Sequence, residues 1–138
     1  MSKTATYRQH HEELRAIAAR IDAVLDLDAI TVSPDEAAAV VRDLFGKFSV
    51  HLAIEDKSLY PRAKAAGNPR LLAVASRFEA EMGDLGKRFD AYRQSWPGPL
   101  AIGRDPARFA RETRAVLAAL RERVGREETE LYDLIDAA

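Results

Sequence analysis

The stretch LLAVASRFEAEMGDLGKRFDAY, residues 71–92, carries the clearest structural signal in the chain. Its apolar residues recur at alternating steps of four and three from Leu71 to Tyr92 without a break. This spacing places them on one face of an α-helix, because side chains three and four positions apart lie above one another. We therefore predict a helix over residues 69–94 that buries one stripe against other helices.

Three groups of turn-forming residues divide the chain into four segments: DLDAITVSPDE (26–36), PRAKAAGNP (61–69) and SWPGPLAIGRDPA (95–107). Ser33 before Pro34, and Asp105 before Pro106, are typical of helix starts, since a capping side chain there precedes a proline in the first turn. No segment shows the period of two that marks a strand. We predict helices over residues 4–27, 34–64, 69–94 and 106–136.

Short connections between long amphipathic helices favour antiparallel neighbours. The sequence therefore predicts an all-α fold, an up-down-up-down antiparallel four-helix bundle that forms a single domain over residues 1–138. The connection at residues 96–102 is apolar for a loop, and we expect it to cap one end of the bundle.

Composition excludes several classes of function. The 138 residues include no cysteine, which removes disulfides, thiolate metal sites and cysteine nucleophiles. The net charge of −1 provides no general basic field, so we expect no nucleic-acid partner. No apolar run is long enough to span a bilayer, and the first residues lack a signal-peptide core. We therefore expect a cytoplasmic protein without a membrane partner.

Five ionisable side chains fall on stripe positions that leucine, phenylalanine, valine and alanine otherwise fill. They are His11, His51, Glu55, Arg123 and Glu127. Burying such groups costs several kcal/mol unless they are paired or bound to a metal. Counting from the predicted helix ends, with about 1.5 Å of rise per residue, places all five at one height, together with Met82. We predict a polar layer across the middle of the bundle.

Four members of this layer are candidate metal ligands. His51 and Glu55, four positions apart, present a nitrogen and a carboxylate on one helix face. With His11 and Glu127 they would supply two imidazoles and two carboxylates, which suit one iron, manganese or zinc ion. The alternative needs no metal: the guanidinium of Arg123 could satisfy both carboxylates, and the layer would then only fix the register of the helices.

The same residues resemble the hemerythrin-like, HHE cation-binding family. HHEEL, residues 10–14, is similar to the site of the first ligand, and HLAIEDKSLYP, residues 51–61, closely matches the second-helix motif His-x-x-x-Glu. RVGREETELYD, residues 123–133, is similar to the fourth-helix motif, with Glu127 as its carboxylate. The resemblance covers essentially the whole chain. It implies a four-helix bundle with a two-iron centre bridged by Glu55 and Glu127.

Two departures from the family pattern fall on one iron of that centre. Met82 stands where the third-helix histidine is expected, and Arg123 stands in place of the fourth-helix histidine. In the family those two histidines serve the second iron. We hypothesise that the permanent charge of Arg123 replaces that iron. The resemblance then implies a mononuclear or vestigial site, and reversible oxygen carriage is disfavoured.

The function that the sequence favours is cation binding by a sensor, regulatory or metal-handling module. A metal-free bundle that serves protein–protein interaction is the second hypothesis, and a protein partner or a homo-oligomer is compatible with both. Histidine phosphotransfer is a third class, which we disfavour because His51 lies on the core stripe. No pattern specifies a substrate pocket, so we expect no enzymatic turnover. We interpret Tyr60 and Tyr132, at matching places in the two Leu-Tyr pairs, as boundary packing residues.

Overall fold

The computed structural model describes residues 3–138, which form helices and no strand. The prediction of an all-α fold is therefore confirmed. The elements are α1 (Ala5–Val24), α2 (Leu27–Val32), α3 (Pro34–Ile54), the π-helical turn η1 (Glu55–Leu59), α4 (Tyr60–Ala65), α5 (Pro69–Ser95), α6 (Pro99–Arg104), α7 (Pro106–Arg126), the π-helical turn η2 (Glu127–Tyr132) and α8 (Asp133–Ala137).

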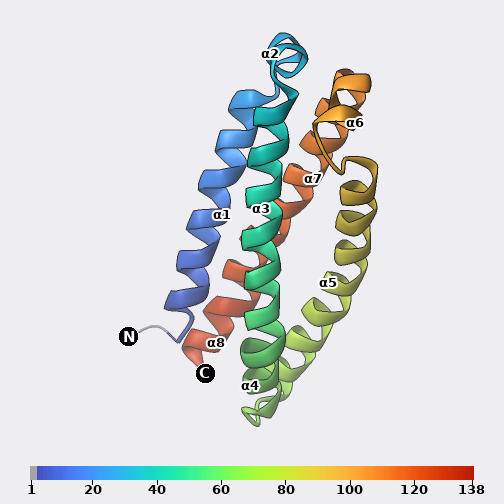
Figure 1. Ribbon diagram of the computed structural model, residues 1–138. Coiled ribbons are helices and arrows are strands. Elements are labelled where there is room, and N and C mark those ends of the chain that lie inside the picture. The colour runs from blue at the N-terminus through green and yellow to red at the C-terminus, as the bar shows by residue number, and fades with distance from the viewer. Residues whose placement is uncertain (1–2) are drawn as a thin grey trace.

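Four long helices, α1, α3, α5 and α7, lie side by side, and consecutive ones run in opposite directions (Figure 1). The short helices α2 and α6 lie at one end of this bundle, and α4 and α8 lie at the other. Packing is closest between α1 and α3, and the segment α4 packs against α5. Because η1 and α4 continue α3 without a break, the predicted segment 34–64 is one continuous helical rod.

The helix ends follow local capping chemistry. Asn68 accepts hydrogen bonds from the backbone N–H groups of Arg70 and Leu71 at the start of α5, and Asp105 accepts one from Arg108 at the start of α7. Gly67 ends the preceding helix with a φ of 79°, which only glycine adopts without strain.

One predicted helix end and one predicted cap differ from the structure. The first helix ends at Val24 and not at residue 27, because the side chain of Asp26 caps a new helix by accepting from the N–H of Ala29. Ser33 precedes Pro34 as expected, but its side chain makes no capping hydrogen bond in this structure. The connection at residues 96–102 includes the first four residues of the short helix α6 and covers its end of the bundle with the buried Ile102.

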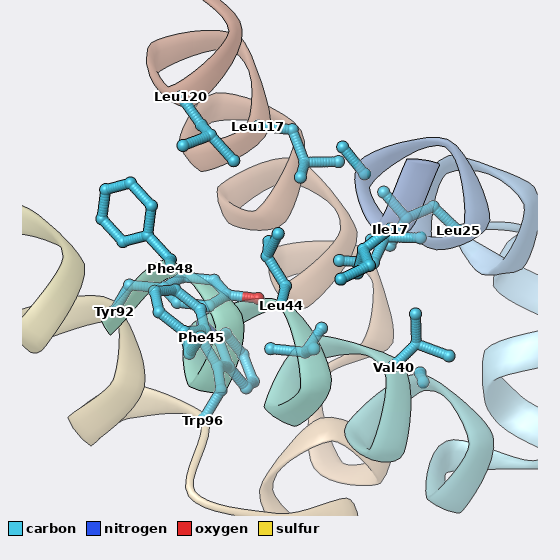
Figure 2. Packing of buried hydrophobic residues seen from close by; sticks show 14 of the residues in the cluster. Ile17, Leu25, Val40, Leu44, Phe45, Phe48, Tyr92, Trp96, Leu117 and Leu120 are labelled. Atoms are coloured by element: carbon cyan, nitrogen blue, oxygen red, sulfur yellow. The ribbon is translucent and has the colours of Figure 1, made fainter. Parts of the chain in front are cut away.

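The apolar core consists of two clusters. The larger includes Phe45, Phe48, Tyr92, Leu117 and Leu120 from α3, α5 and α7, which point toward one another in Figure 2. The smaller lies toward α4 and α8 and includes Phe78 and Leu131. Along each long helix the predicted polar layer falls at the junction of the two clusters: His11, for example, lies between Tyr7 of the smaller cluster and Leu14 of the larger.

Candidate metal centre

The four predicted ligands come together in the structure. His11 is on α1, His51 is near the end of α3, and Glu55 and Glu127 are the first residues of η1 and η2. Each is at most 2% exposed. One ligand atom from each residue can be chosen so that all of these atoms lie within 4.8 Å of one another. The four side chains could therefore hold a single metal ion.

Each of the two carboxylates opens a π-helical turn. In such a turn the backbone N–H bonds the carbonyl five residues earlier, as Tyr60 does with Glu55. In a regular α-helix, a residue five positions on lies about 140° around the axis. The wider turn instead brings the fifth residue over the carboxylate, so that the Tyr60 hydroxyl donates to Glu55 Oε2 over 3.1 Å.

Tyr60 and Tyr132 are therefore part of the centre, and their interpretation as boundary packing residues is wrong. Both are fully buried. The Tyr132 hydroxyl donates to Glu55 Oε1 at 2.6 Å and lies 3.1 Å from Nε2 of His11. Burial and the nearby glutamates raise the pKa of both phenols, so both hydroxyls carry their protons. The sequence signal that could have identified them is the spacing Glu-x-x-x-x-Tyr, which occurs at Glu55–Tyr60 and again at Glu127–Tyr132.

A carboxylate outside the predicted set orients His11. Glu128 accepts from Nδ1 of His11 over 2.9 Å, and Arg15 in turn holds Glu128. Burial lowers the pKa of His11, which favours a neutral ring. Because Nδ1 carries the proton, the lone pair on Nε2 faces the centre. Metal-bound histidines commonly have this arrangement with a carboxylate.

His51 links α3 and η1, which form one continuous helical segment, to α1. Its Nε2 lies 2.7 Å from Glu55 Oε1 and 3.1 Å from the Nε2 of His11. Its Nδ1 lies 3.4 Å from Nδ1 of the half-buried His10, a neighbour that the sequence pattern did not assign to the centre. Both buried histidines thus direct Nε2 toward the same point. Their burial also removes the exposure that a phosphoacceptor histidine requires.

The two central carboxyls differ in protonation. Burial opposes ionisation of Glu55, but its hydrogen bond to His51 and the charge of His51 outweigh that cost and lower its pKa. Burial raises the pKa of Glu127, and the charge of Glu55 raises it further. Glu55 therefore ionises more readily than a free carboxyl, and Glu127 ionises less readily. A proton thereby reduces the repulsion between two carboxyls that share one buried space.

Arg123 stands beside this pair and is only 4% exposed. Its Nη2 donates to the Tyr60 hydroxyl at 3.0 Å and to the carbonyl of Phe78 at 2.7 Å, and it lies 3.8 Å from Glu127 Oε2. We expected its guanidinium to donate to both Glu55 and Glu127. The structure corrects this: the contact with Glu127 is an ion pair at 3.8 Å and not a hydrogen bond, and the Tyr60 hydroxyl, brought inward by η1, stands between Arg123 and Glu55 and relays their contact.

The outer side of Arg123 faces acidic and apolar groups. Nη1 lies 3.5 Å from Oε2 of Glu81, and the guanidinium carbon lies 4.5 Å from the centre of the Phe78 ring. A cleft of about 250 Å³ between α5 and α7 reaches Arg123 from the surface. Met82 is buried in the larger apolar cluster. The positions of the third- and fourth-helix histidines of the family pattern thus hold a thioether and a permanent cation.

Comparison with known protein families decides the class. The sequence profile of the hemerythrin HHE cation-binding domain matches residues 2–135. The chain belongs to this family. Searches of curated proteins and of solved structures find no match. No helix among residues 3–138 is long and apolar enough to cross a membrane.

The residues of this hemerythrin-family chain fit a cation of the expected type. Two imidazole nitrogens and two carboxylate oxygens converge in a buried space, and iron, manganese and zinc all accept such donors. One histidine is already oriented by Glu128, which favours cation binding through Nε2.

Proposed function

We propose that the protein binds one iron, manganese or zinc ion through His11, His51, Glu55 and Glu127, and that it acts as a sensor, regulatory or metal-handling module. The observation that carries the proposal is the convergence of four buried ligand atoms within 4.8 Å. Burying such groups is costly, and a bound cation offsets that cost.

Arg123 supports a count of one cation. Its guanidinium contacts Tyr60 and approaches Glu127, on the side where the family pattern would require further ligands. A guanidinium offers no lone pair to a metal and repels a second cation. We therefore propose that the protein is not an oxygen carrier of the two-iron type.

The chain's own residues would hold and shield the bound ion. An ion at this centre supplies a concentrated positive charge and, if it is iron or manganese, a one-electron redox couple. Glu128 fixes the ring orientation of His11, and Tyr60 holds the carboxylate of Glu55 through Oε2. The two apolar clusters exclude bulk water. We propose binding and signalling, without enzymatic turnover.

Metal content measured by inductively coupled plasma mass spectrometry tests this proposal. The samples are wild type, His51→Ala and Glu127→Gln, purified without an immobilised-metal step. Glu130→Gln is the matched control, because Glu130 lies in the same π-helical turn but on the surface. We expect about one ion per chain in wild type and in the control, and its loss in both site variants. Equal, substoichiometric metal in all four proteins would refute the proposal.

A metal-free bundle for protein–protein interaction is the second candidate. It is favoured by the fact that hydrogen bonds already connect the polar groups of the layer, from Arg123 through Tyr60 to Glu55. This candidate predicts a wild-type protein without stoichiometric metal that folds equally well in chelator. The same mass spectrometry measurement therefore separates the two functions.

A further inference from the structure

The Tyr132 hydroxyl directly contacts two of the proposed ligand atoms, Glu55 Oε1 and His11 Nε2. Four atoms form a closed ring of contacts. From His11 Nε2 to His51 Nε2 is 3.1 Å, and from there to Glu55 Oε1 is 2.7 Å. From Glu55 Oε1 to Tyr132 Oη is 2.6 Å, and from Tyr132 back to His11 Nε2 is 3.1 Å. Glu127 Oε1 lies 3.3 Å from the same nitrogen of His11.

These lengths match the edges of a coordination polyhedron. Ligands at about 2.1 Å from one cation, at right angles to one another, are about 3.0 Å apart. The four distances in the ring, 2.6–3.1 Å, are close to this separation. The phenol oxygen of Tyr132 lies as near to its two neighbours in the ring as the three predicted ligand atoms lie to one another. We propose that Tyr132 is a fifth ligand, which binds as a phenolate and makes the centre selective for ferric iron. This inference rests on the proposed cation site.

The second tyrosine of the centre has a different position. The Tyr60 hydroxyl contacts the outer carboxylate oxygens, at 3.1 Å from Glu55 Oε2 and 3.4 Å from Glu127 Oε2. It also accepts a hydrogen bond from Arg123 over 3.0 Å. Its oxygen therefore faces the guanidinium and makes no described contact with either ligand histidine. Tyr60 positions the carboxylates, and it serves as the matched control for Tyr132.

Charge explains why a trivalent ion suits this ring. With Glu55, Glu127 and Tyr132 all ionised, the ligands carry three negative charges, and the two imidazoles are neutral. Ferric iron neutralises these charges inside a site that excludes water, and it prefers hard anionic oxygen donors. Binding releases to solvent the phenol proton of Tyr132, together with the carboxyl proton that Glu127 holds without the ion. The charge of Arg123 has its own counterion in Glu81, 3.5 Å away.

Ferric loading followed by visible absorption and resonance Raman spectroscopy tests the inference. Wild type, Tyr132→Phe and Tyr60→Phe are each loaded with one equivalent of ferric iron, and iron content is measured on the same samples. We expect a phenolate-to-iron charge-transfer band in the visible region, with tyrosine ring modes enhanced on excitation into it. Tyr132→Phe should lose the band and keep most of the iron. Tyr60→Phe should keep both.

The possible failures are distinguishable. Wild type that binds iron without the band overturns the phenolate ligand and leaves the cation site standing. A band that survives in Tyr132→Phe, or that is lost only in Tyr60→Phe, also overturns it. Wild type that binds no ferric iron overturns both proposals. If Tyr132→Phe does not fold, a band retained in Tyr60→Phe still assigns the ligand to Tyr132, because Tyr7 and Tyr92 direct their hydroxyls to Ser58 and Thr113.

Discussion

At the scale of single residues, Arg123 shows how one substitution changes the chemistry of a family site. A histidine at that position would offer a neutral donor to a metal, whereas arginine brings a charge that never dissociates. The surroundings suit the change: the Phe78 carbonyl and the Tyr60 hydroxyl accept from one nitrogen, and Glu81 balances the charge. Arg123 is therefore integrated into the core and is not a passive replacement.

This integration predicts a large stability cost for Arg123→Met. The variant removes the hydrogen bonds that Arg123 donates to the Tyr60 hydroxyl and to the Phe78 carbonyl, and it removes the charge nearest to Glu127. We expect a loss of about 3 kcal/mol in the free energy of unfolding, measured by urea denaturation.

Arg121→Met is the control for that measurement. Arg121 lies one half-turn away on α7 and pairs with Asp22 at the surface, with a side chain 44% exposed. An exposed ion pair contributes less than about 1 kcal/mol, so the control should unfold nearly as wild type does. If Arg123→Met is as stable as this control, the buried network does not hold the bundle together.

At the scale of elements, the two π-helical turns and the long helix α5 differ in how their sequence relates to their structure. The regular helices could be predicted because apolar spacing reports the usual helical period, and because a cap before a proline, such as Asp105 before Pro106, marks a helix start. The π turns could not, since that analysis assumes about 100° per residue. Tyr60 and Tyr132 were misassigned for this one reason. The short helix α2 was missed because its cap, Asp26, lies inside a stretch that otherwise resembles a turn.

The helix α5 contains a glycine whose replacement should increase the stability of the protein. Gly83 lies in its middle, and a Cβ built there meets nothing within 4 Å. Since alanine loses less backbone entropy than glycine, Gly83→Ala should stabilise the protein by about 0.5–1 kcal/mol, read as a rise in thermal midpoint. Gly67→Ala is the opposing case, because its φ of 79° disfavours a Cβ. A fall in the midpoint for Gly83→Ala would mean that this helix face is occupied in solution.

At the scale of the whole molecule, the polar layer lies between the two apolar clusters, and its hydrogen bonds connect residues on different long helices. The sequence predicted one buried layer for His11, His51, Glu55 and Glu127 because each interrupts an apolar stripe, and the structure brings them together. It could not locate Glu128 or Arg15, because their contacts cross from one helix to another near the surface, where charged residues are common. A polar residue on an apolar stripe can be recognised from the sequence as a buried polar group. The residues that orient such a group are recognised only from the three-dimensional structure.

A cation at such a junction should stabilise the entire bundle. Binding to the folded state alone adds about 2.7 kcal/mol at a ligand concentration of one hundred times Kd, or roughly 10 °C in thermal midpoint for a chain of this size. We expect the midpoint of wild type to rise with added ferric iron, manganese or zinc and to fall in chelator. His51→Ala should respond to neither. A wild-type midpoint that is indifferent to both additions would favour the metal-free bundle.

The π-helical turns have a consequence for how this centre arises and disappears. Each turn closes on the fifth residue and not the fourth, so it contains one residue more than the regular helix would. Substitutions elsewhere in η1 or η2 that let the same number of residues wind as a regular α-helix would place the tyrosine about 140° around the axis from its glutamate, with every ligand still encoded. The capacity of this chain to hold an ion thus depends on how these two turns wind as well as on which residues they contain, and a lineage can lose it through substitutions that touch none of the residues a motif search would examine.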